Sequence, residues 1–464
     1  MPASTSILDE KAFYGETLGT HAGHKLNLVI REYYDSSTVT FVTNNGIECD
    51  MFEGCGAMIL DNIKTREEAL EIMETIQTEV RNADLPDLVD MLKAQSDCRY
   101  DVVVPASQIE MRGGDLIVQG GAARVTADGV TTTDARLVPT PIFDEGVSHR
   151  FDIPLKYVRT MRGRVAGDIE STDAPIDVEP TLYDENVNYW LAANPNKRHL
   201  VRGFRTDDAD EPGIARALLS DRYRTIDNYD VLMATLTGVR AAGVEVNIDG
   251  GDLSDRRMSL RLTCPEVTAY ANEILGGYRS PFTGETGSDN PTVFAGLVVK
   301  NSETGGGAFT IVPRIVVQVC NNGLQLTKDA MRAVHLGGKL DDGVVRWSDD
   351  TQQHELSLIT SKARDAVATF LDVDYMRTKI QELQELAGVE VTRPADTIQR
   401  VSKKAGWSET EQDEILSHFI RGGQTTALGV AQAVTAYAQT VQSIDRQDEL
   451  ETTAILAAEL AAVG

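Results

Sequence analysis

Two side chains in the second half of the chain, Cys320 and His335, could act together as a nucleophile and its base. A thiol is activated when a nearby imidazole accepts its proton, so the pair is compatible with an enzyme of unknown reaction. The alternative is structural, because Cys320 ends an apolar run and is followed by Asn321-Asn322-Gly323. Asparagine and glycine accept positive φ, and this pattern is typical of a tight turn that ends a strand.

Cationic and amide side chains on outward strand positions form a second set of candidates. They could contact the phosphates of a nucleic acid, since arginine, lysine and glutamine donate hydrogen bonds to phosphate oxygens. Arg279 also follows Tyr278, and an aromatic ring beside a guanidinium can stack a base while the cation contacts the backbone. Each cation could instead pair with one of the chain's many acids. The candidate nucleic-acid-binding residues are Arg257, Arg261, Arg279, Lys300, Arg314 and Gln318.

The sequence does not indicate a metal or cofactor site. Its five cysteines form no Cys-x-x-Cys pair, which favours reduced thiols over a zinc site or a disulfide framework. His21 and His24 are three residues apart, but no carboxylate stands beside them in this predicted loop. The chain also lacks a phosphate-binding loop that ends in Lys-Ser or Lys-Thr, and it lacks a Gly-x-Ser-x-Gly elbow. We therefore expect neither a metal nor a cofactor.

The charge of the chain limits its possible partners. It has 464 residues, of which 71 are acidic and 44 basic, and a net charge of -27. Such a charge argues against a protein that coats nucleic acid by bulk electrostatics, but it leaves room for a local site. The most basic window, Arg150 to Arg164, predicts either a solvated helix face or a phosphate-contacting patch. No membrane helix or secretory signal is visible, so we expect no membrane partner and a cytoplasmic protein.

Hydrophobic alternation predicts the strands that must position the candidate cations. In the strand predicted over Ala308–Cys320, five apolar side chains fall on one face, while Arg314 and Gln318 fall on the other. The preceding strand is Asn290–Lys300, and a glycine-rich hairpin loop joins the two. An earlier hairpin alternates in the same way and places its arginines outward. The apolar set of Ala308–Cys320 is Phe309, Ile311, Ile315, Val317 and Val319.

Blocks of strands followed by blocks of helices predict the α+β class, with antiparallel sheets, packed helices and a C-terminal helical region. Residues 1–190 form an N-terminal α+β region, which is either a separate domain or part of the same sheet. Residues 191–350 form the core antiparallel-sheet domain, and residues 351–464 form the helical region. Capping boxes predict helices that begin after Thr65 and Ser408, and an apolar stripe from Leu428 to Ile444 predicts a further helix.

Four separated motifs carry a family resemblance. They run from Leu219 to Asn228, from Pro313 to Gly323, from Arg332 to His335, and from Gly423 to Tyr437. In their order and spacing they resemble the phage/plasmid-like protein family known as domain of unknown function 932, over roughly residues 200–455. Members often carry a threonine after the histidine, where this chain has Leu336. The motif residues of interest are Arg222, Tyr223, Asn228, Cys320, Asn321 and His335.

The resemblance implies a gene carried by phages, proviruses or plasmids, whose product acts inside the host cell. Our first hypothesis is a protein that binds or anneals single-stranded DNA in replication or recombination of a mobile element. The predicted layout resembles that of annealing proteins, which implies a homo-oligomer with a basic groove along the sheet. Two alternatives are the enzyme based on Cys320 and His335, and an acidic binding protein that is either an anti-defence factor with a host protein partner or a structural virus protein.

Overall fold

The computed structural model describes residues 12–21, 24–33, 36–43, 48–50, 79–126, 129–166, 181–205, 211–223, 225–319, 322–333 and 349–463. The chain divides into two compact units, of which the first is Met1–Thr75 with Ser171–Asp173. In this first unit four strands form an antiparallel sheet in chain order: β1 (Ala12–His21), β2 (His24–Tyr33), β3 (Ser36–Thr43) and β4 (Glu48–Asp50). The helix predicted after Thr65 lies outside the described residues.

The second unit contains a six-stranded sheet that spans the boundary predicted at residue 190. Its order is β6-β10-β11-β9-β8-β7, and every pairing is antiparallel except that of β11 with β9. Strands from residues 99–139 therefore pair with strands from residues 198–220, so the predicted boundary lies between two strands of one sheet. The strands are β6 (Arg99–Pro105), β7 (Ile109–Arg112), β8 (Asp115–Thr126), β9 (Gly129–Pro139), β10 (Arg198–Phe204) and β11 (Gly213–Ser220). Helices α4 (Pro141–Phe151), α5 (Leu155–Ala166) and α6 (Leu182–Ala193) pack with this sheet around one apolar core.

A seven-stranded antiparallel sheet forms the centre of the second unit. Its order is β16-β15-β14-β13-β12-β5, and β17 pairs with the first residues of β15 on the same side as β16. The strands are β5 (Val80–Ala83), β12 (Asn247–Leu253), β13 (Met258–Tyr270), β14 (Thr292–Asn301), β15 (Phe309–Val317), β16 (Asn322–Gln325) and β17 (Met331–Ala333). The α+β fold class and the antiparallel hairpins predicted from alternation are confirmed.

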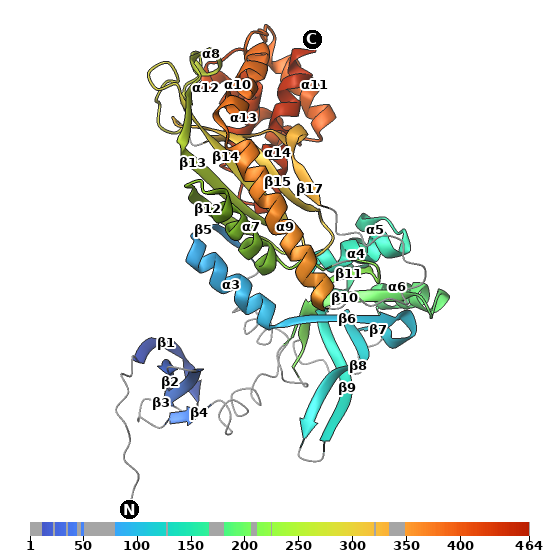
Figure 1. The fold of residues 1–464 in the computed structure, drawn as a ribbon. Helices are drawn as coiled ribbons and strands as arrows, with labels where there is room; N and C mark the ends of the chain where they lie inside the picture. The colour runs from blue at the N-terminus through green and yellow to red at the C-terminus, as the bar shows by residue number, and fades with distance from the viewer. Residues whose placement is uncertain are drawn as a thin grey trace, which may run out of the picture. The chain divides into compact units, whose positions relative to one another are not determined.

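The first face of the seven-stranded sheet is the core face. The five apolar side chains predicted to share one side of β15 and its extension all lie in this core. Helices α3 (Leu85–Asp97), α7 (Asn228–Ala242) and α9 (Asp349–Phe370) contribute the opposing side chains, and α7 and α9 lie side by side (Figure 1). Gly238 of α7 permits this close approach, because an added Cβ would lie 2.8 Å from the Cβ of Ala363.

The C-terminal region is helical, as predicted, and α14 occupies a special place in it. The helices after α9 are α10 (Val373–Ala387), α11 (Pro394–Ala405), α12 (Glu409–Gly422), α13 (Ala427–Ala438) and α14 (Ile444–Ala462). Ser408 and Glu411 form the predicted capping box of α12. The stripe from Leu428 to Ile444 was predicted as one helical face, but the structure divides it, because α13 ends at Ala438 and α14 begins at Ile444. The break allows α14 to lie over the second face of the seven-stranded sheet, where it contacts Lys300 and Gln325.

Candidate anion-binding site

Three of the candidate cations lie together on the second face of the seven-stranded sheet. Strand register places Arg261 opposite Val298, Lys300 opposite Thr310, and Arg314 opposite Gly296. Val298, Val312 and Val316 on this face are also buried, so the face is covered rather than open. The structure therefore brings the predicted cations together, but in an environment that the sequence did not predict.

Arg314 and Arg261 are buried ion-pair partners within the sheet. Arg314 pairs with Asp249, and only 5% of its side chain is exposed. Burial lowers the pKa of the Arg314 guanidinium even though the charge of Asp249 opposes this effect. Arg261 pairs with Asp252, and Asp252 in turn accepts a hydrogen bond from the backbone of Asn82 in β5. Arg261 thus joins the neighbouring strands β13 and β12, and Arg314 links β15 to β12 across the two strands between them, so both have little surface left for a ligand.

Arg257 and Lys300 contact the acidic side of α14. The Asp448 carboxylate lies 2.5 Å from the Arg257 guanidinium through one oxygen and 2.5 Å from the Lys300 ammonium through the other. Lys300 also donates a hydrogen bond of 2.8 Å to the hydroxyl of Thr452. Asp445 stands 3.4 Å from Arg257. Unlike Arg314, both cations retain part of their surface, with 19% and 12% of their side chains exposed.

The other two candidates, Arg279 and Gln318, are exposed and lie outside the strands of the sheet. Arg279 belongs to the loop after α8 (Asn272–Leu275), where its backbone amide donates to the carbonyl of Gly422. Its neighbour Tyr278 is only 2% exposed and packs in the core. The ring of Tyr278 therefore does not stand open to stack a base, contrary to the pairing inferred from the sequence.

A pocket of about 240 Å³ opens where Arg257 and Lys300 meet α14. Thr310 and Val312 of β15 line it, together with Ser302, Gly306 and Gly307 of the β14–β15 loop. Thr327, Ala330 and Arg332 also line it, as do Asp448 and Thr452 of α14. Polar hydroxyls and three cations thus surround a space that can hold a small group such as a phosphate.

The charge within the pocket is the reverse of that of the whole chain. Arg257, Lys300 and Arg332 face a single lining acid, Asp448. Arg332 is exposed, and no ion pair holds it among the residues that the structure describes. Sequence reasoning had placed Arg332 in a family motif but not among the binding residues. The pairing of β17 with β15 sets Arg332 opposite Thr310 and so brings it to the pocket.

Residues of the segment Leu219–Asn228 support the β14–β15 loop, which lines this pocket. The Tyr223 hydroxyl donates a hydrogen bond of 3.0 Å to the Ser302 carbonyl, and burial raises the pKa of Tyr223 to about 12. The Asn228 side chain accepts a 2.9 Å hydrogen bond from the Asn301 amide. Arg222 is exposed. Two of the three motif residues therefore fix the β14–β15 loop.

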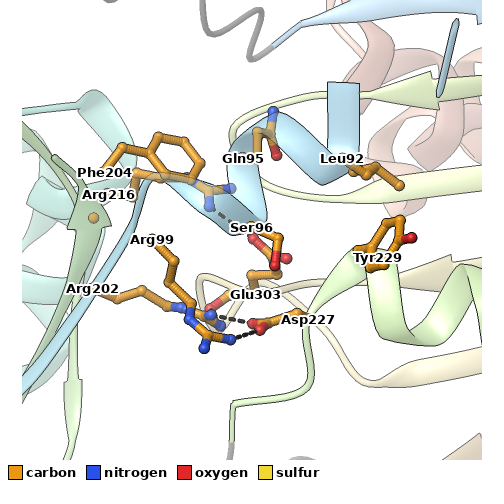
Figure 2. A pocket seen from close by; sticks show the side chains of 11 residues that line it. Leu92, Gln95, Ser96, Arg99, Arg202, Phe204, Arg216, Asp227, Tyr229 and Glu303 are labelled. Carbon is orange, nitrogen blue, oxygen red and sulfur yellow. Dashed lines mark hydrogen bonds and ion pairs between the residues drawn. The ribbon is translucent and has the colours of Figure 1, made fainter. Parts of the chain in front are cut away.

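Behind this loop lies a buried cluster of ion pairs, which joins the two sheets of the second unit (Figure 2). Arg202 of β10 has 2% of its side chain exposed and pairs with Asp101 at 3.0 Å and with Asp227. Arg216 of β11 pairs with Glu303 at 2.7 Å. The other carboxylate oxygen of Glu303 accepts a 2.6 Å hydrogen bond from the backbone of Asn228.

The pKa shifts in this cluster show that its charges depend on one another. Burial by itself would lower the pKa of Arg202, but Glu303, Asp101 and Asp227 outweigh burial and raise it above its ordinary value. Burial likewise favours the neutral form of Asp227, yet Arg202 and Arg99 hold its pKa below the ordinary range. The cavity here is only about 10 Å³, which is room for about one water molecule. We therefore interpret the cluster as structural support rather than a ligand site.

The nucleophile and base that the sequence suggested lie outside the described residues. Cys320, Asn321 and His335 lie outside them, and of the predicted turn only the backbone of Asn322 and Gly323 in β16 is described. Within the described part of the chain, no group of three or more histidine, cysteine, aspartate or glutamate side chains could hold a metal ion.

In the basic window Arg150 to Arg164, several cations are already bound to side chains of the protein. Arg162 forms an ion pair with Asp144 at 2.8 Å, and Arg159 pairs with Glu145 at 3.0 Å. Arg150 donates a 3.2 Å hydrogen bond to Nδ1 of His199, which is fully buried in β10. Burial, followed by the charges of Arg150 and Lys197, lowers the pKa of His199 to about 4.

Acidification should therefore destabilise the fold through His199. Between its ordinary pKa of 6.5 and its folded pKa of about 4, the unfolded chain binds a proton that the folded chain excludes, so stability falls with pH. From pH 7 to pH 4.5 this contribution amounts to about 2 to 3 kcal/mol. Urea unfolding of the wild type and of His199→Gln at both pH values measures it, since the variant lacks this titration. An equal pH dependence in the two proteins would contradict the assignment.

No family model, curated protein or solved structure matches this chain. Among the described helices, none combines the length and the apolar character that crossing a membrane requires.

Proposed function

We propose that this protein binds the backbone of single-stranded DNA at the pocket lined by Arg257, Lys300 and Arg332. The observation that carries the proposal is the concentration of three cations around one acid in a chain whose net charge is -27. A locally positive, concave surface is what a phosphate needs, because a low-dielectric wall strengthens its attraction to each cation. The family resemblance adds a cellular setting: a homo-oligomer of a mobile element, acting inside the host cell.

The chemistry of the lining favours the backbone over the bases. The Thr452 hydroxyl accepts a hydrogen bond from Lys300 and can donate its own proton to a phosphate oxygen, whereas the hydroxyls of Ser302 and Thr310 already donate to backbone carbonyls. The Gly306-Gly307 segment has no side chains to block close approach. None of the described residues that line the pocket is aromatic, so a stacking platform for bases is not part of it. Binding should accordingly show strong salt dependence and little preference for sequence.

The test is fluorescence anisotropy of a labelled oligo-dT titrated with the protein at 50 mM salt. We expect a dissociation constant on the order of 10 µM, as for non-specific electrostatic binding. Arg332→Gln should weaken binding about tenfold and reduce the slope of log affinity against log salt by about one. Arg332 is chosen because it is exposed and its replacement leaves the ion pairs of α14 intact.

Arg377→Gln is the matched control, since Arg377 is an exposed arginine of α10 that pairs with Asp374. It changes the net charge by the same amount but should leave affinity and salt slope as in the wild type. Equal loss in both variants would show that only net charge matters. Absence of binding by the wild type at 100 µM protein would refute the proposal.

A further inference from the structure

The acidic side of α14 forms ion pairs with two of the cations that the proposed function assigns to phosphate, Arg257 and Lys300. Asp445, Asp448 and Glu451 follow one another at intervals of three residues, so they share one helix face over about 9 Å. Asp445 approaches Arg256 and Arg257 at 3.4 Å, and Asp448 binds Arg257 and Lys300. Glu451 accepts a 3.0 Å hydrogen bond from Gln325, which pairs with Arg314 in the strand register.

The opposite side of α14 is apolar and explains why the helix stays in place. Leu450, Ala454, Ala457, Ala458 and Ala461 are buried in the main core. α14 is therefore anchored by packing, independently of its carboxylates, and the carboxylates project toward the sheet. An anchored row of negative charges that satisfies cations on a sheet face has the chemistry of a bound nucleic-acid backbone.

We propose that the α14 carboxylates Asp445 and Asp448 act as a built-in competitor that holds the affinity of the pocket for DNA phosphate low. This inference rests on the proposed function and specifies how the same site is regulated. A phosphate that enters the pocket competes with Asp448 for the positive charge of Arg257 and Lys300, because Asp448 already neutralises part of that charge. Arg332, which has no such acid partner among the described residues, would make the first contact.

The two available carboxylates are held to different degrees. Asp448 makes two ion pairs of 2.5 Å, whereas Asp445 contacts its arginines only at 3.4 Å and accepts a 2.8 Å hydrogen bond from the Ser254 hydroxyl. Neutralising Asp448 should therefore release more cationic charge than neutralising Asp445. The competition model therefore predicts a larger gain in DNA affinity for Asp448→Asn than for Asp445→Asn. Net charge alone predicts equal gains, because both substitutions remove one negative charge.

The experiment compares oligo-dT binding by Asp448→Asn, Asp445→Asn and the control Asp413→Asn, using the same anisotropy assay at 50 mM salt. Asp413 is an exposed acid of α12, so its replacement changes the net charge equally without touching the pocket. We expect Asp448→Asn to bind about tenfold more tightly than the wild type and to raise the salt slope by about one. Asp445→Asn should show a smaller gain, and Asp413→Asn none.

Each outcome separates the two proposals. If the wild type binds and Arg332→Gln weakens binding, but Asp448→Asn binds no more tightly than Asp413→Asn, DNA binding stands and the competitor role is overturned. If no variant binds DNA, the proposed function fails and the inference fails with it. Circular dichroism of each variant at the assay temperature identifies unfolded protein, and Asp445→Asn provides the measurement if Asp448→Asn does not fold.

Discussion

Replacement of Arg202 by methionine should lower the free energy of unfolding by about 3 to 5 kcal/mol, the usual cost of removing one partner from a buried ion pair. Arg202 is 2% exposed and neutralises Asp101 and Asp227 while also donating to the Glu303 carbonyl. Methionine fills similar space but leaves these acids buried without their main counter-charge. The loss should therefore be electrostatic rather than a packing effect.

Urea or thermal unfolding of Arg202→Met measures this effect, with Arg364→Met as the control. Arg364 pairs with its neighbour Asp365 on the surface, with both side chains about half exposed or more, and its loss should cost less than about 1 kcal/mol. Adding Asp227→Asn to Arg202→Met should recover part of the stability, because it removes one of the stranded charges. A loss below about 1 kcal/mol for Arg202→Met would contradict the assignment of the cluster as a support.

A second large effect is expected at Gly429, in the first turn of α13. An added Cβ would lie 1.9 Å from the backbone carbonyl oxygen of Gln424 and 3.3 Å from the Phe419 ring. This oxygen belongs to the turn that leads into α13. The turn is itself held in place, because the Gln424 side-chain amide donates a 2.9 Å hydrogen bond to the Ile274 carbonyl. Since a backbone atom has no rotamer to change, Gly429→Ala must displace the turn and should cost about 3 kcal/mol or more.

The matched control is Gly388→Ala, just after α10. Its added Cβ would meet only ordinary contacts of 3.5 Å with the carbonyls of Gln384 and Glu385. Loss of chain entropy in the unfolded state makes this change neutral or slightly stabilising, by up to about 1 kcal/mol. Comparison of the two melting temperatures distinguishes the steric effect from a general effect of glycine replacement. Similar temperatures for both variants would contradict the close approach at Gly429.

Local pattern was sufficient to predict the four central strands of the seven-stranded sheet, β12 to β15, but not β5, β16 or β17. In β15 the alternation between Ile311, Ile315 and Val317 on one side and Arg314 on the other is written in consecutive residues, and the core side was identified correctly. The six-stranded sheet as a whole was not predicted, because β10 and β11 pair with strands far from them in the chain. β11 and β9 pair in parallel, and a parallel pair is not joined by a hairpin turn whose residues could be recognised in the sequence.

The environment of the candidate cations could not be predicted for the same reason. Arg257 and Lys300 alternate outward as an exposed ligand-binding face would, and their sequence neighbours are strand residues. Their partner Asp448 comes about 150 to 190 residues later in the chain, on α14, which the sequence predicts only as part of a helical region. Charge pairing between distant elements leaves no periodic signal, so only the fold distinguishes Arg332 in the pocket from Arg314 in the sheet.

The β14–β15 loop has a further consequence through its two sets of contacts. On one side Ser302 and Gly306 line the pocket, and on the other Glu303 is held by Arg216 of the six-stranded sheet. Occupation of the pocket and cohesion of the two sheets are therefore thermodynamically linked, since a ligand that binds the ordered loop favours every contact that keeps the loop ordered. Reciprocally, a change that weakens the contacts between the two sheets would disorder the β14–β15 loop and so weaken ligand binding, without altering any residue that touches the ligand.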